Sequence, residues 1–248
     1  MAPRTRLIAI ATLAVLSLFG FFVAAPIAQD DAYHRFADGR AWLGIPNFLN
    51  VVSNLPFAVV GLIALARRGS FPVRLGASRF AWVAFFAGVL LVALGSAYYH
   101  WAPTSETLVW DRLPMTLAFM GLTVALLTEW VSPVARHILP FALVLGVMSV
   151  IVWTTTGDLR LYFGVQLMPM VVAAAALVLF RAPFTHTWHI GVAVMLYALA
   201  KIVEAADQSI YTATEGALSG HPLKHIFAAG ATWWIYDMLR KRRARPTA

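Results

Sequence analysis

The chain has 248 residues, of which 60% are hydrophobic and only 12% are charged. Soluble domains are only about half apolar, so this composition predicts an integral membrane protein of the all-α class. The absence of cysteine excludes disulfides, thiolate nucleophiles and cysteine-ligated metals. The net charge of +8 does not indicate nucleic-acid binding, because the basic residues lie between apolar segments and at the termini.

The first apolar segment, residues 7–25, follows a short basic start and is long enough to cross a membrane. It is a transmembrane helix or a signal peptide, and the poor cleavage site at residues 26–28 favours the helix. We therefore divide the chain into three parts. Residues 1–28 form the transmembrane helix or signal peptide, residues 29–240 a seven-helix transmembrane bundle, and residues 241–248 a basic cytoplasmic tail.

Seven further apolar segments follow in the bundle. With the first segment they make eight spans, which place both termini on one side of the membrane. Most lysines and arginines lie in loops on that side, so the positive-inside rule predicts cytoplasmic termini for a multi-pass protein of the cell (inner) membrane. The segments are residues 47–66, 80–99, 113–130, 138–153, 161–180, 190–206 and 219–237.

The second segment carries three asparagines, Asn47, Asn50 and Asn54, at spacings of three and four. This spacing places them on one helical face, which faces protein rather than lipid. Hydrogen bonding between helices is the favoured interpretation, and direct contact with a metal is the alternative.

In the seventh apolar segment, Lys201 and Glu204 are spaced as a neutralising pair that faces the bundle interior. The alternative is that Glu204 or Asp207 supports a neighbouring site. A cation-coupled transporter could also use these residues, but the repeats and broken helices common in transporters are not evident.

Three histidines occur at the ends of apolar segments. His221 and His225 are four residues apart at the start of the last segment, and His100 follows Ser96 by the same spacing. Residues four apart lie on one helical face. The predicted topology also places these residues and Asp111 on the outer face. Three of the remaining four histidines, His137, His186 and His189, fall on the cytoplasmic side and are predicted to be ordinary interfacial residues; the fourth, His34, lies in the polar stretch before the second segment.

A catalytic zinc ion takes three protein ligands and keeps one position open. His100, His221 and His225 would supply the three ligands, and Asp111 would be a fourth contact or the general base. Ser96 would donate a hydrogen bond to a developing oxyanion or orient a ligand. The alternative is that the histidines only form hydrogen bonds within the bundle.

These motifs together resemble the alkaline ceramidase family, within the superfamily that includes the adiponectin and progestin receptors and Per1. The resemblance rests on Asn50-Val51-Val52-Ser53-Asn54, Ser96-x-x-x-His100, Asp111 and His221-Pro222-Leu223-Lys224-His225. It implies a zinc hydrolase that cleaves the amide of a long-chain base, with three histidine ligands and catalytic Asp111 and Ser96. It also implies a role in sphingolipid metabolism.

The chain departs from the eukaryotic members in two respects. Those enzymes have an acidic amino-terminal calcium site that ends in glutamate before the asparagine-rich helix, and Asn47 takes that place here. The spacing of Asp30, Asp31 and Asp38 does not reproduce the site either, which counts against calcium. The extra apolar segment before the bundle is the second departure.

The favoured hypothesis is a zinc-dependent membrane amidohydrolase whose partners are a lipid amide substrate and membrane lipids, with no nucleic acid. The alternative is a non-enzymatic zinc-containing receptor or lipid-binding protein. Neither the acyl substrate nor the oligomeric state follows from the sequence.

Overall fold

The structure is a computed structural model that describes residues 25–71 and 76–245. Within those ranges the chain folds into helices and has no β-strand. The longer helices are α3 (Leu55–Ala66), α4 (Arg79–Trp101), α5 (Ser105–Leu126), α6 (Leu139–Thr156), α7 (Arg160–Leu179), α8 (Trp188–Ala205) and α10 (Gly220–Lys241). The shorter ones are η1 (Asp31–His34), α2 (Phe48–Val52), η2 (Arg68–Ser70), the π-helical turn η4 (Leu127–Val131), η5 (Pro133–Ile138) and α9 (Asp207–Ala213).

Six helical segments of the described chain are long and apolar enough to cross a membrane, and each coincides with a predicted segment. The last predicted segment forms α10, which has 22 residues but is more polar and is not among the six. The predicted first segment falls on residues 1–24 almost entirely, outside the described residues. The six segments are Phe48–Ala66, Arg79–Trp101, Ser105–Val131, Pro133–Thr156, Arg160–Leu179 and Trp188–Ala205.

Helix α5 begins earlier than the apolar pattern predicts, at Ser105 instead of residue 113. Thr104 caps this helix, because its hydroxyl oxygen accepts a hydrogen bond from the backbone N–H of Thr107 at 3.2 Å. The first two turns include Asp111 and Arg112, which are charged but buried inside the bundle. The polarity that excluded these turns from the predicted span therefore belongs to the interior of the protein.

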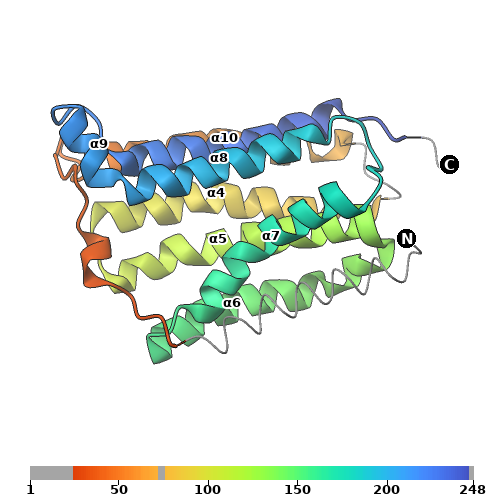
Figure 1. Cartoon of the computed structure of the whole chain (residues 1–248), viewed down its shortest axis with the longest axis horizontal. Helices are drawn as coiled ribbons and strands as arrows, with labels where there is room; N and C mark the ends of the chain where they lie inside the picture. The colour runs from red at the N-terminus through yellow and green to blue at the C-terminus, as the bar shows by residue number, and fades with distance from the viewer. Residues whose placement is uncertain (1–24, 72–75, 246–248) are drawn as a thin grey trace.

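The helices lie roughly parallel or antiparallel in a bundle (Figure 1). Helices α8 and α10 pack side by side, α4 packs closely on α5, and α5 also contacts α6 and α7. Figure 1 shows α7 crossing α5 obliquely, with η1 and α9 at one end of the bundle. We call this end, where α4 finishes and α10 begins, the histidine end; the other is the opposite end.

Two glycines permit close helix contacts beside the predicted site. A Cβ atom at Gly95 would overlap the carbonyl oxygen of Trp110 in α5. A Cβ atom at Gly220 would overlap the carbonyl oxygen of Val203 in α8. Only glycine allows both backbones to approach so closely. These contacts hold α4 against α5 next to Ser96, and α10 against α8 at the residue before His221.

Residues 25–46 cross the histidine end of the bundle (Figure 1). The backbone N–H of Ala37 donates to Oδ2 of Asp207 at 2.9 Å, and the side-chain amide of Asn50 donates to the carbonyl oxygen of Asp38 at 3.1 Å. The ring of Phe36 lies 4.8 Å from the ring of His100 and 4.6 Å from that of His221, between centroids. This segment therefore covers the histidines.

The opposite end holds a buried ion pair between Glu129 in η4 and Arg242 just after α10. Two guanidinium nitrogens of Arg242 donate to the Glu129 carboxylate at 2.6 and 2.8 Å. Ser78 and Trp82 donate to the same carboxylate at 2.6 and 2.7 Å. The carboxylate is thus fully supplied with donors, and the cluster fastens the end of α10 to α4 and η4.

The prediction that His189 is an ordinary interfacial residue is wrong. Its side chain is buried in α8, and its Nε2 lies 3.1 Å from a carboxylate oxygen of Asp237 in α10. Apolar periodicity does not reveal this partner, which is 48 residues away in the chain. His137 and His186 are exposed, as predicted.

Candidate metal centre

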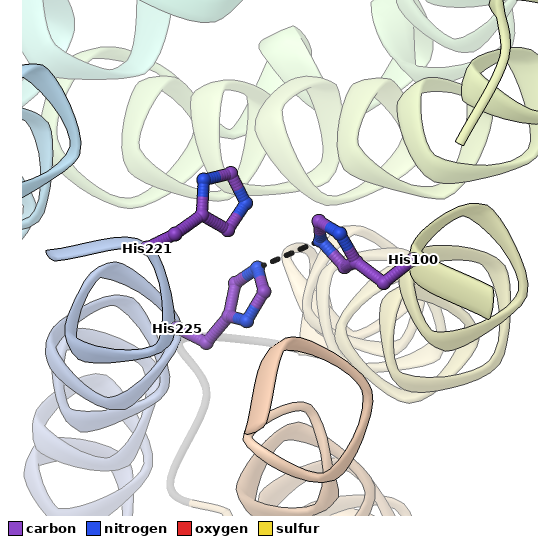
Figure 2. Close-up of side chains that lie close together, drawn as sticks. All are labelled: His100, His221 and His225. Atoms are coloured by element: carbon purple, nitrogen blue, oxygen red, sulfur yellow. Dashed lines mark hydrogen bonds between the residues drawn. The ribbon is translucent and has the colours of Figure 1, made fainter. Parts of the chain in front are cut away.

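The three predicted ligand residues meet at the histidine end. His100 lies in the last turn of α4, and His221 and His225 lie in the first two turns of α10 (Figure 2). All three are buried, with exposed fractions of 0%, 4% and 4%. One ring nitrogen from each can be chosen so that the three lie within 4.8 Å of one another. Two helices that are distant in sequence thus converge on one small group of imidazoles.

The donor set fits a metal ion such as zinc. Nε2 of His100 lies 3.2 Å from Nε2 of His225, the contact dashed in Figure 2. Two ligand nitrogens of a tetrahedral zinc ion are separated by about 3.3 Å, as Zn–N bonds of about 2.05 Å require. Nδ1 of His100 is buried without a hydrogen-bond partner. Three buried imidazoles whose ring nitrogens lie this close together could bind a metal ion, and the unpartnered Nδ1 of His100 shows that hydrogen bonds within the bundle do not account for all of them.

Ser53 orients His225 from the side away from the other histidines. Its hydroxyl oxygen lies 2.7 Å from Nδ1 of His225, and its hydroxyl group donates to the carbonyl oxygen of Asn50 at 3.2 Å. Since the hydroxyl proton of Ser53 is directed to that carbonyl, the lone pairs of the serine oxygen are free to accept a hydrogen bond from the Nδ1–H group of His225. This tautomer leaves the lone pair of Nε2 available on the side facing His100.

The hydrogen bonding between helices predicted for the asparagine face of the second segment is confirmed for Asn47, whereas Asn50 and Asn54 bond to the covering segment and within their own segment. The side chain of Asn47 donates to the carbonyl oxygen of His100 at 2.9 Å, which links the start of α2 to the end of α4. Asn54 donates to the carbonyl oxygen of Asn50 at 2.8 Å. These asparagines therefore support the residues around the histidines.

A charged network supports His221. The ammonium group of Lys224 lies 2.9 Å from Nε2 of His221 and donates to Glu204 at 2.9 Å. Because an ammonium group has no acceptor, Nε2 of His221 accepts this bond, so a metal ion bound through Nε2 would displace the ammonium group from it. Glu204 also pairs with Lys201, as predicted. The alternative role of Glu204, support of a neighbouring site, is confirmed as well, because Glu204 bonds to Lys224 and Lys224 bonds to His221.

Asp207 supports the same histidine from the backbone side. Its Oδ1 accepts a hydrogen bond from the backbone N–H of His221 at 2.7 Å, while Oδ2 accepts from Ala37. A carboxylate at the start of α10 satisfies an N–H group that has no partner inside the helix. Asp207 thus joins the covering segment to the helix that carries two of the three histidines.

Asp111 and Ser96 line a cavity that begins beside the histidines. The Asp111 carboxyl group interacts with the Ser96 hydroxyl and lies within the electrostatic range of Lys224 and Arg112. Both Asp111 and Ser96 are buried, and the cavity that they line is also lined by His225. The structure therefore brings the predicted carboxylate and hydroxyl to the cavity wall next to the histidine cluster.

The cavity has a volume of about 360 Å³ and extends from this polar end into the apolar interior. Along α5 it reaches from Asp111 to Leu126, which corresponds to about 22 Å of helix axis. One leaflet of a bilayer contributes about 15 Å of hydrocarbon. Far from the histidines the walls are apolar, with Ala173 of α7 and Ile190 of α8 among them. The cavity is long enough to hold a lipid chain whose polar end lies at the histidines.

The covering segment has its own electrostatics. Arg40 donates hydrogen bonds to both carboxylate oxygens of Asp38 at 2.8 and 2.7 Å, which lowers the pKa of that carboxyl group. His34 bonds to the hydroxyl groups of Tyr99 at 3.0 Å and Ser105 at 3.1 Å. Burial, followed by the nearby charge of Arg112, lowers the pKa of His34. The segment is thus fastened to α4 and α5 by a neutral imidazole.

Sequence reasoning did not single out three supporting residues: Ser53, Lys224 and Phe36. Ser53 and Lys224 stand inside the motifs that were identified, between residues that attracted attention for other reasons. Their position within those motifs is a signal that could have found them. Phe36 lies in a polar stretch and gave no comparable signal.

A family model described as Ceramidase matches residues 44–240. None of the curated proteins compared with the chain matches it. The matched region runs from just before α2 to the last turn of α10 and includes the histidine cluster, Ser96 and Asp111. The chain belongs to the ceramidase family.

Proposed function

We propose that the protein is a zinc-dependent membrane hydrolase that cleaves the amide bond of a ceramide-like lipid to a long-chain base and a fatty acid. The observation that carries the proposal is the cluster of three buried histidines, one of which, His225, lines the polar end of a cavity that extends along about 22 Å of the α5 axis and has apolar walls beyond. An amide at the polar end would lie beside the histidines, while its acyl chain would occupy the apolar part. Membership of the ceramidase family supports the same substrate class.

His100, His221 and His225 would hold the zinc ion. Zinc bound at such a site supplies Lewis-acid activation of a carbonyl group and of water. Asp111 would accept a proton from the attacking water, whose oxygen forms a bond to the carbonyl carbon of the amide. Ser96 would donate a hydrogen bond to the carbonyl oxygen as it gains charge. As the C–N bond breaks, Asp111 would return the proton to the leaving amine.

The proposed orientation places both termini in the cytoplasm and the histidine end at the outer face of the cell membrane. It is based on the arginines and lysines of the loops and tail, which cluster toward the opposite end. A lipid would then enter sideways from the outer leaflet, because Phe36 and its neighbours cover the histidines from the aqueous side.

The test measures metal content by mass spectrometry on detergent-purified protein, together with release of fatty acid from a fluorescent ceramide. Wild type should carry about one zinc ion per chain. His221→Ala should lose zinc and hydrolysis together. The exposed His137 offers a matched control, and His137→Ala should retain both. Wild type without zinc, or full activity after zinc removal, would exclude the proposed mechanism.

The alternative is a receptor or lipid-binding protein in which zinc is structural. Asp111 distinguishes the two, because it would be a general base in one case and a closing fourth ligand in the other. For the hydrolase, Asp111→Asn should abolish turnover while zinc stays bound. For a structural site, the same variant should mainly weaken zinc binding and thermal stability.

A further inference from the structure

Arg112 lies at the polar end of the cavity, and the proposed mechanism gives it no role. It is the residue after Asp111 in α5 and has an exposed fraction of 4%. Its guanidinium carbon lies 4.0 Å from the ring centroid of Trp153 and 4.8 Å from that of Tyr162. The two rings pack against the guanidinium group, so the position of the charge is fixed by α6 and α7.

This guanidinium group has an unused donor. Nη2 donates to the side-chain oxygen of Gln29 at 2.5 Å, but Nη1 is buried and has no hydrogen-bond partner. Within the described chain, no carboxylate oxygen lies close enough to form an ion pair with Arg112. A buried cation without a counterion is costly, because the two rings and Gln29 replace only part of the hydration that burial removes.

Two carboxylates at this end of the bundle pair with other cations, whereas Asp30 and Asp111, which line the same cavity as Arg112, form no ion pair within the described residues. Glu204 pairs with both Lys201 and Lys224, and Asp158 pairs with Arg160 at 2.7 Å. Consecutive residues of a helix project about 100° apart. Asp111 therefore faces Ser96 and Lys224, whereas Arg112 faces α6 and α7. Arg112 is therefore a fixed cation on the wall of the cavity that His225 also lines.

We propose that Arg112 binds an anionic oxygen group, such as a carboxylate, phosphate or sulfonate, at the polar end of the lipid amide. The planar guanidinium group matches these anions, which accept parallel N–H bonds from one edge. With the amide at the histidines, the polar end of the lipid extends toward Gln29 and Arg112, which line the same cavity. The inference rests on the proposed amide hydrolysis and makes acidic lipid amides the preferred substrates over neutral ones.

The test compares kcat/KM for amides that all carry the same acyl chain and differ in the polar amine part. The neutral substrate is ceramide, and the anionic ones are ceramide 1-phosphate, an N-acyl amino acid and an N-acyl taurine, which separate phosphate from carboxylate and sulfonate. Wild type should prefer at least one anionic amide about 10- to 100-fold, the range expected for a charged hydrogen bond. Arg112→Gln should lower this preference to near unity, and Arg112→Lys should restore part of it.

A second readout measures the binding of fluorescent anionic and neutral amides to the same samples, with no hydrolysis required. If wild type cleaves no amide but still binds the anionic lipid more tightly, and Arg112→Gln loses that difference, the proposed function fails while recognition by Arg112 stands. Equal binding of both lipids, or a preference that survives in folded Arg112→Gln, would overturn the inference. Arg240→Gln is the control, because Arg240 pairs with Asp237 at the opposite end.

Discussion

The hydroxyl oxygen of Ser53 lies 2.7 Å from Nδ1 of His225, although 172 residues separate the two in the chain. A serine of the first described long segment thereby sets the tautomer of a histidine in the last helix. Hydrogen bonds of this kind hold a metal-binding imidazole in one orientation and raise its basicity.

Ser53→Ala should therefore weaken zinc binding about 10- to 100-fold, the usual effect of losing a hydrogen bond to a ligand. Zinc affinity is measured by competition with a chelator. Ser149→Ala removes another buried serine, whose hydroxyl group donates to Gly146 in α6, and should leave the affinity unchanged. If the two variants bind zinc equally well, Ser53 does not orient the ligand.

Filling the far part of the cavity should shorten the acyl chain that the protein accepts. Ala173 of α7 lines the cavity far from Asp111, and Ala173→Phe adds a ring where the end of a long chain would lie. Preference should shift toward amides with shorter chains, measured as kcat/KM across a chain-length series. Ala174→Phe adds the same ring on the exposed side of α7 and serves as the control. An unchanged profile in Ala173→Phe would show that the chain lies elsewhere.

Acid should loosen the covering segment through His34. Its lowered pKa means that the folded protein binds this proton more weakly than the unfolded chain does. Stability is therefore lost as the pH falls below about 6.5, the pKa of a free imidazole. His34→Gln keeps a polar side chain but cannot titrate, so the melting temperature of wild type should fall more than that of the variant between about pH 7.5 and about pH 5.5. If the melting temperatures of wild type and His34→Gln fall equally with pH, His34 is not the group through which acid loosens the covering segment.

Glu129→Gln should destabilise the opposite end without affecting the metal. It leaves Arg242 charged and buried with no carboxylate, a change that costs about 3–5 kcal/mol in buried ion pairs. The free energy of unfolding is measured with denaturant in detergent, and zinc content is measured on the same samples. Glu215→Gln, at an exposed acid, is the control. If Glu129→Gln lowers the free energy of unfolding as little as Glu215→Gln does, then water reaches the Glu129 carboxylate.

The sequence was informative about the spans because burial in a bilayer requires long apolar segments, and these are local patterns. It also predicted that His100, His221 and His225 would meet, since charge fixed the side of the membrane on which each segment ends. The early start of α5 was missed because Asp111 and Arg112 face the interior, and hydropathy alone cannot tell a buried charge from a solvated one. The Ser53 contact and the buried pair of His189 with Asp237 depend on distant segments, so no local pattern contains them.

Because α10 carries His221 and His225, the histidine cluster can form only after the last long helix of the described chain has been made. Translation proceeds from the amino terminus, and His100 and Ser53 reach the membrane well before their partners. A partly synthesised chain holds one histidine of the three and has no complete site. Under the proposed function, metal would therefore be acquired late in biogenesis, and products of premature termination would be inert toward the surrounding lipids.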